Sequence, residues 1–201
     1  ILHVILRPYQ NSSVDAIFEA WLKSVATLLV LPTGCGKTQV FTEVIRRVHP
    51  KKSIVIAHRE ELITQARARI EQMTGLKCEV EMGGLKASDT LWNKADVIIA
   101  TVQTLNSADR LKKFRPEDFG LLVIDEAHRG TCCTYRKVVD HFRQNPELRV
   151  LGLTATPDRL DEQALGQVFE SVAFEYALPD AIDDGWLVPV VQNYVHIQGL
   201  D

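Results

Sequence analysis

Residues 30–38 read VLPTGCGKT, and this stretch decides which fold the rest of the chain must build. An apolar run at residues 26–31 comes directly before its polar part, and an amphipathic run at residues 37–48 follows. The two glycines allow positive φ angles and let backbone N–H groups approach an anion without a Cβ in the way. A strand, a glycine-rich turn and a helix that begins with lysine and threonine together predict a phosphate-binding loop.

Each part of this loop has an expected task. The helix N-terminus adds its partial positive charge, Lys37 is expected to contact the β- and γ-phosphates of ATP, and the Thr38 hydroxyl is expected to bind Mg²⁺. The general pattern G-x-x-x-x-G-K-[ST] begins with glycine, whereas this chain has Leu31 there, so Pro32 must make the entry turn. The residues expected to surround the phosphates are Thr33, Gly34, Cys35 and Gly36.

Short apolar runs alternate with amphipathic patterns along the chain, and this alternation predicts an α/β fold. Solid Val, Ile, Leu and Ala runs, typical of strands buried on both faces, lie at residues 28–31, 54–57, 97–100 and 121–124. We therefore expect a three-layer fold in which a mostly parallel sheet has helices on both faces. Helical spacing marks residues 11–25, 37–48, 59–73 and 161–169, and residues 171–178 and 187–197 are β-rich.

Polar clusters follow the expected strands, where ligands bind in sheets of this kind. The clusters are Thr33–Thr38, His58–Arg59, Thr101–Thr104, Asp125–His128 and Thr154–Thr156. A protein core has no need of five polar strand ends. We therefore expect one site along the carboxyl edge of the sheet.

The sequence LLVIDEAH supplies the second half of this site. A carboxylate directly after a buried strand is suited to bind the metal beside a phosphate loop, so Asp125 is expected to hold Mg²⁺, partly through water. Glu126 is expected to orient and deprotonate the attacking water. Together with Lys37 these acids form the expected catalytic set. Neither the metal nor the water explains why a histidine stands at position 128.

Six segments, taken in chain order, resemble the motifs of the first RecA-like domain of superfamily two helicases of the DEAH-box kind. They are LRPYQ (6–10), LPTGCGKT (31–38), AHREELITQ (57–65), TVQTL (101–105), DEAH (125–128) and TAT (154–156). Each segment is short, but the order and spacing of all six make the resemblance specific. A leucine at the first loop position is itself usual in this family.

The resemblance implies roles that phosphate chemistry alone does not explain. It implies that Gln10 pairs with adenine, and that Tyr9 or Arg7 flanks the base. Coupling of the nucleotide to domain movement is implied for His128, Thr154 and Thr156. Contacts to a nucleic-acid backbone, made without reading sequence, are implied for His58, Arg59, Thr101 and Thr104.

The net charge of −3 counts mildly against a surface built mainly to coat nucleic acid. Local basic groups are therefore the candidates: Arg46–Arg47 with Lys51–Lys52, Arg67 with Arg69, and Arg110, Lys112, Lys113 and Arg115. Each is more often a solvated helix face. Trp92 and Trp186 are alternative stacking platforms for bases, although tryptophans of this kind more often pack the core or an edge.

The four cysteines, Cys35, Cys78, Cys132 and Cys133, show neither zinc-ribbon spacing nor a disulfide framework. Reduced thiols and a cytoplasmic location are the simplest expectation. A Cys35 sulfur exposed at the helix N-terminus would have a lowered pKa. Every apolar run is shorter than the roughly 18 residues that cross a bilayer, so no membrane partner is expected.

We expect residues 1–201 to form a single RecA-like ATP-binding domain cut from a longer protein. The resemblance implies a second RecA-like domain that supplies arginines to the same ATP, and no segment of this kind follows TATPDRL in this sequence. Because such an arginine contributes about 10³ to 10⁵ in turnover, the isolated fragment is expected to hydrolyse ATP very slowly.

The expected function is that of the motor domain of an ATP-dependent helicase or translocase. TATPDR and AIDDGWLVP look most like helicases akin to restriction-enzyme translocase subunits and repair helicases, so DNA is favoured over RNA as the partner. Two other classes stay open. A phosphotransferase would give DEAH and TATP no task, and a non-hydrolysing ATP-binding module would not need Glu126.

Overall fold

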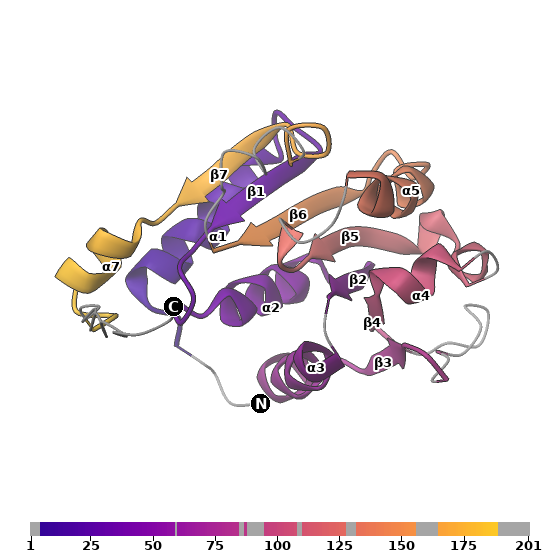
Figure 1. Cartoon of the computed structure of the whole chain (residues 1–201), viewed down its shortest axis with the longest axis horizontal. Helices are drawn as coiled ribbons and strands as arrows, with labels where there is room; N and C mark the ends of the chain where they lie inside the picture. The colour runs from indigo at the N-terminus through magenta and orange to yellow at the C-terminus, as the bar shows by residue number, and fades with distance from the viewer. Residues whose placement is uncertain are drawn as a thin grey trace, which may run out of the picture.

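The computed structural model describes residues 5–58, 60–84, 87, 95–107, 110–127, 132–155 and 165–188. Strands and helices alternate through most of this chain (Figure 1). The strands are β1 (Ala26–Val30), β2 (Lys52–Ala57), β3 (Cys78–Glu81), β4 (Val97–Thr101), β5 (Phe119–Ile124), β6 (Arg149–Thr154) and β7 (Ser171–Glu175). The helices are α1 (Pro8–Ala20), α2 (Lys37–Val48), α3 (Glu60–Thr74), α4 (Val102–Asn106), α5 (Cys132–Phe142) and α7 (Leu178–Asp183), with 3₁₀ turns at Leu111–Lys113 and Pro116–Asp118.

The described strands form one sheet in the order β3-β4-β2-β5-β6-β1-β7. Every pair in it is parallel, so all the strands end at the same edge. β6 lies between β1 and β5, and its end therefore separates the loop after β1 from the acids after β5. The prediction of a parallel sheet with polar strand ends along one edge is confirmed.

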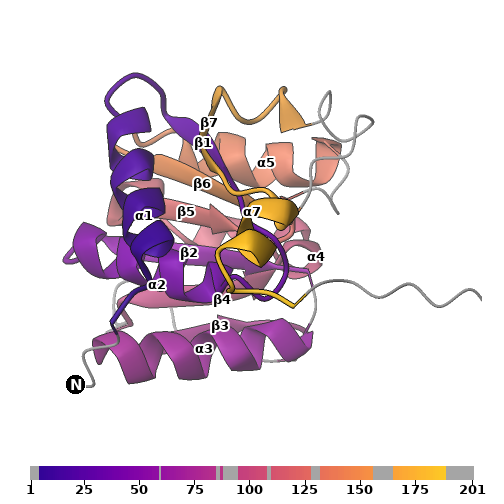
Figure 2. The same cartoon turned by 90° about the vertical axis from the view of Figure 1, so that its left-hand side faces the viewer.

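Helices cover both faces of the sheet (Figure 1 and Figure 2). α1, α2 and α3 pack on one face, in a cluster that includes Ile17, Phe41 and Ile70. α4 and α5 pack on the other face, where Leu105 and Phe142 join the inward side chains of β2 and β5. The strands β1, β4 and β5 are buried along their whole length, which explains why they read as solid apolar runs.

Most predicted elements have the expected bounds, but two expectations were wrong. The first helix begins at Pro8 and not at residue 11, because proline fits the first helical turn and the Gln10 side chain accepts a hydrogen bond from the Arg7 N–H at 2.9 Å. No helix was predicted between the β-rich segments 171–178 and 187–197, whereas α7 lies there, with a proline in its first turn, and ends at Asp183. Residues 189–197 of the β-rich segment predicted at 187–197, and residues 161–164 of the helix predicted at 161–169, lie outside the described residues.

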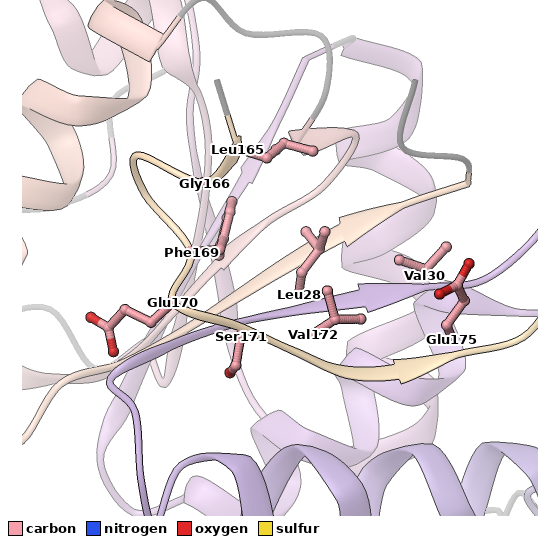
Figure 3. A pocket seen from close by; sticks show the side chains of 9 residues that line it. All are labelled: Leu28, Val30, Leu165, Gly166, Phe169, Glu170, Ser171, Val172 and Glu175. Carbon is pink, nitrogen blue, oxygen red and sulfur yellow. The ribbon is translucent and has the colours of Figure 1, made fainter. Parts of the chain in front are cut away.

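A cavity of about 450 Å³ opens beside β7, on the face of the sheet that α5 covers (Figure 3). Leu28, Val30, Leu165, Gly166, Phe169, Glu170, Ser171, Val172 and Glu175 line it. The two glutamates lie at opposite ends of a mainly apolar wall (Figure 3). None of the predicted site residues is among these, although Val30 and Glu175, the last residues of β1 and β7, bring one end of the cavity to the carboxyl edge. No described helix has both the length and the apolar character needed to cross a membrane.

Candidate nucleotide site

The loop between β1 and α2 has the backbone conformation that its glycines were expected to allow. Gly34 and Gly36 have φ angles of 91° and 75°. A Cβ on Gly36 would lie 2.3 Å from the Gln39 Oε1 atom and 2.6 Å from the Gln10 Nε2 atom, so a larger residue would displace these two side-chain ends. The positive φ angle of Gly36 favours glycine independently of this contact.

The N–H groups of this turn are available to an anion. Among the described residues, no acceptor takes the backbone N–H of Gly34, Gly36, Lys37 or Thr38. The last two belong to the first turn of α2, where helix N–H groups have no intrahelical partner and the dipole is positive. Four adjacent donors around two glycines match the oxygens of a polyphosphate.

Two residues of α1 fix this loop by hydrogen bonds to its backbone. The Tyr9 hydroxyl donates to the Cys35 carbonyl at 2.8 Å, and the Gln10 amide donates to the same oxygen at 3.1 Å. Gln10 gives its second N–H to the Gln39 Oε1 atom at 2.8 Å. The Gln10 side chain is therefore fully engaged in fixing the loop, a structural task that the sequence did not predict. Pairing of Gln10 with adenine stays a prediction, which requires it to release one of these bonds.

Lys37 carries a charge that its surroundings do not satisfy. Its Nζ atom is buried and has no hydrogen-bond partner among the described residues. The nearest opposite charge is the Glu126 Oε1 atom, at 3.6 Å, and the two side chains are only 12% and 21% exposed. A buried ammonium without an acceptor is unfavourable, so a ligand that offers anionic oxygens here would be strongly preferred.

The acids after β5 are held in an unusual turn. Glu126 has a φ angle of 53°, and no other described residue apart from glycine has a positive φ. The Asp125 Oδ1 atom accepts a hydrogen bond from the Glu126 N–H at 3.0 Å, and the Asp125 N–H continues the sheet by donating to the Ile56 carbonyl at 2.9 Å. Strained conformations of this kind persist at functional sites. The turn directs Glu126 toward the phosphate loop across the end of β6.

The chain also matches known proteins along most of its length. The model of the family described as the type III restriction enzyme, res subunit, matches residues 3–159. The chain belongs to this family. It is 34% identical to the putative ATP-dependent helicase IRC3 of Saccharomyces cerevisiae over 96% of its own length and 30% of that protein.

Two further similarities agree with this membership. The DNA 3'-5' translocase XPB2 of Sulfurisphaera tokodaii is 33% identical over 78% of the chain and 32% of that protein. The crystal structure of the Pyrococcus furiosus Hef helicase domain superposes with a TM-score of 0.68 at 27% identity, covering 88% of this chain and 39% of that one. The chain thus spans about a third of the length of these curated relatives. The resemblance stated from the motifs is confirmed.

A cluster of aromatic rings lies beside the expected adenine position. The Tyr9 ring stacks on Tyr176, with the ring centres 4.8 Å apart. The Arg7 guanidinium lies over the Trp186 ring, 4.7 Å from its centre. A pocket of about 400 Å³ next to this cluster reaches the loop at Pro32 and Thr33, and it reaches Ala155 at the end of β6. Trp186 therefore packs against Arg7, and a role for it in stacking nucleic-acid bases has no support here.

The residues predicted to couple nucleotide binding to domain movement, or to contact nucleic acid, differ in how their polar groups are hydrogen-bonded. Thr154 is buried at the end of β6, where its carbonyl accepts from the Leu31 N–H at 3.0 Å, so this strand joins the start of the phosphate loop. His58 follows β2, and its Nδ1 atom is buried without a hydrogen-bond partner among the described residues. Arg59, His128 and Thr156 lie outside the described residues, as do Trp92 and the side chains of Cys132 and Cys133.

Thr101 and Thr104 form one hydrogen-bonded unit at the end of β4. The Thr101 hydroxyl accepts from the Thr104 N–H at 3.3 Å and donates to the Thr104 Oγ1 atom at 2.8 Å, which makes it the N-cap of α4. Thr104 also accepts from the Gly83 N–H at 3.2 Å. Thr101 has therefore used its hydroxyl hydrogen inside the protein, whereas the Thr104 hydroxyl hydrogen has no acceptor among the described residues. The predicted hydrogen bond to a nucleic-acid backbone therefore fits Thr104 better than Thr101.

Most of the candidate basic residues are paired with acids. Glu43 accepts hydrogen bonds from both Arg46 and Arg47, which lower the pKa of its carboxyl. Other pairs are Lys51–Glu147, Arg67–Glu71 and Arg115–Asp118. Arg110 and Lys113 contact the buried Glu81 carboxylate, at 3.3 and 2.6 Å. Most of these basic groups lie at the surface, in keeping with the more ordinary interpretation of each cluster as a solvated helix face, whereas Arg110 and Lys113 compensate a buried charge.

The expectation for Cys35 depended on exposure, and its sulfur is not exposed. Cys35 is fully buried, and burial is the main reason why the pKa of its thiol is raised and not lowered. Cys78 is likewise a buried free thiol, with a pKa raised by burial to about 12. Both are unreactive by this criterion.

Proposed function

We propose that this chain is the ATP-binding motor domain of an ATP-dependent helicase or translocase. The observation that carries the proposal is the buried Lys37 ammonium, which lies 3.6 Å from Glu126 at an edge lined by backbone N–H groups; neither it nor those N–H groups has a hydrogen-bond acceptor in the described part of the chain. The names of the relatives support the same activity: one is a putative ATP-dependent helicase and another a DNA translocase. The domain would comprise residues 1–201, with a second RecA-like domain elsewhere in the full-length protein.

The residues present fit a magnesium-bound triphosphate. Lys37 and the N–H groups of the loop would bind the phosphate oxygens. The Thr38 hydroxyl and the Asp125 carboxylate are oxygen ligands of the kind that Mg²⁺ takes, partly through water. When bound, the metal neutralises charge on the phosphates and on the leaving group. Both ligand residues lie at the sheet edge beside the loop.

Glu126 is the residue we assign to the attacking water. Its carboxylate would orient the water for in-line attack and accept a proton from it. Lys37 must leave Glu126 to bind the phosphates, so nucleotide binding would free this carboxylate for its catalytic task. The arginines that complete the charge stabilisation would come from the second domain, and the isolated piece would turn over very slowly.

DNA is the favoured partner, because the XPB2 relative is named as a DNA translocase. An RNA helicase of the same superfamily is the alternative. Comparing the stimulation of ATP hydrolysis by single-stranded DNA, duplex DNA and RNA, at one salt concentration, would decide the substrate class. A cytoplasmic location stays a prediction, which imaging of the tagged full-length protein would test.

The substitution Glu126→Gln in the full-length protein tests whether ATP hydrolysis at this site drives movement. We expect ATP turnover to fall at least 10²-fold, because the base is lost while the shape is kept. Mg-ATP binding, measured by calorimetry, should persist. Unchanged translocation by this variant would show that hydrolysis at this site does not drive movement, and would favour a non-hydrolysing module. Absence of nucleotide binding by the wild-type protein would refute the site altogether.

A further inference from the structure

Tyr135 is a buried residue that takes no part in the chemistry assigned so far. It is on α5, which covers the face of the sheet opposite to the α2 face (Figure 1). It packs in the same apolar cluster as Ile124 and Ala127, the residues on either side of the acidic pair. Only 4% of Tyr135 is exposed. The core therefore holds the side chain in place, in the cluster that also contains the two residues flanking Asp125 and Glu126.

The hydroxyl of Tyr135 has no hydrogen-bond partner among the described residues, although it is buried. Buried hydroxyls are nearly always paired, so an unpaired one requires an explanation. Its pKa is raised to about 12, mainly by burial and further by the negative charges of Asp125 and then Glu126. The group thus stays protonated, is a permanent donor, and lies within electrostatic reach of two carboxylates that are acceptors only.

We propose that Tyr135 is a positioning residue for the acidic pair: its hydroxyl donates a hydrogen bond to a carboxylate oxygen of Asp125 or Glu126 when Mg-nucleotide binds. This inference rests on the proposed function. Without nucleotide, the Lys37 ammonium lies 3.6 Å from the Glu126 Oε1 atom. Once Lys37 binds phosphate, Glu126 loses that contact, and a donor fixed in the core adds a new one to the acidic pair.

The substitution Tyr135→Phe in the full-length protein removes the donor and keeps the ring. Because it deletes an unpaired hydroxyl, the melting temperature of the nucleotide-free protein should stay the same or rise. The Kd for Mg-AMP-PNP should increase about tenfold, as expected for a lost hydrogen bond to a charged group. The Kd for AMP-PNP in EDTA should change by less than about twofold, because the acidic pair acts through the metal. ATP turnover should fall together with Mg-AMP-PNP affinity.

Ser53→Ala is the matched control. The Ser53 hydroxyl is also buried and unpaired among the described residues, but it lies near the start of β2, at the opposite edge of the sheet. It should leave both affinities and the turnover unchanged. The inference is overturned if Tyr135→Phe binds Mg-AMP-PNP like the wild type, or if it lowers the melting temperature of the nucleotide-free protein. If the wild-type protein itself binds no Mg-AMP-PNP, the proposed function fails. That result differs from both outcomes that would overturn only the role of Tyr135.

Discussion

The two ends of the carboxyl edge differ in how a buried charge is compensated by neighbouring groups. At the β1–β5 end, the Lys37 ammonium is buried with Glu126 at 3.6 Å and no hydrogen-bond acceptor among the described residues. At the β3–β4 end, the buried Glu81 carboxylate accepts hydrogen bonds from Lys113 and from the Ala87 N–H, both at 2.6 Å, and lies 3.3 Å from Arg110. The Glu81 Oε1 atom also has no hydrogen bond among the described residues, but two cations lie within 3.3 Å of this carboxylate. At the first end, the acid that the structure shows near Lys37 lies farther away, at 3.6 Å.

This difference gives a physical criterion for a site. A polar residue at a strand end is equally consistent with a cap, an ion pair or a ligand contact. A buried polar atom whose own chain does not satisfy it is consistent with far fewer roles, because leaving it unpaired is unfavourable. The described side chains that have such an atom are those of Lys37, Thr42, Ser53, His58, Glu81 and Tyr135, whereas Thr101 has none. Among these, Lys37 combines an unpaired buried charge with a position beside the phosphate loop.

The largest expected effect is that of Lys37→Ala at the first end. ATP turnover of the full-length protein should fall by about 10³, as for loss of a preorganised charge at a reacting phosphate. Stability should not fall, because a poorly satisfied buried charge is removed. Turnover assays and thermal melts check both parts, with Lys51→Ala as a control in an exposed ion pair. A clear drop in melting temperature would mean that the Lys37–Glu126 contact supports the fold, and the comparison would fail.

At the other end, Glu81→Gln should damage stability and spare nucleotide binding. Removing one member of a buried ion pair costs about 3 kcal/mol. Here Arg110 and Lys113 would lose the negative charge that compensates them. Denaturant unfolding would measure the loss. The matched control is Glu147→Gln, whose exposed pair with Lys51 should contribute less than about 1 kcal/mol. Equal effects of the two variants would contradict the assignment of Glu81 as a structural centre.

The smallest effect is expected for Thr101→Ala, which sharpens the comparison within one hydrogen-bonded unit. Loss of the N-cap of α4 should cost about 1 kcal/mol of stability and leave DNA affinity nearly unchanged. Thr104→Val removes the hydroxyl hydrogen that remains available, so it should weaken DNA binding by about two- to threefold at fixed salt. Binding titrations with a labelled oligonucleotide would separate the two. The reverse pattern would assign the nucleic-acid contact to Thr101.

Local patterns predicted the elements of the fold well where one signal dominated. The bounds of α2 follow from its lysine after glycine and its apolar spacing, and β5 follows from its solid apolar run. The start of α1 was misplaced because Asn11 and the serines that follow it resemble caps, whereas Pro8 and the Gln10 side chain set the true start. α7 was missed because it is one short turn and a half, with too few residues for a periodic pattern.

The sequence by itself determined the class of the site: a glycine-rich turn before Lys37 and an acid pair after a buried strand leave little chemical choice. It also determined the parallel sheet, since strands buried on both faces must be apolar throughout. Only the tertiary structure decided which polar groups are satisfied. Hydrogen bonds such as those from Tyr9 and Gln10 to the Cys35 carbonyl join residues about 25 positions apart, and no local pattern encodes whether a given atom will find such a partner.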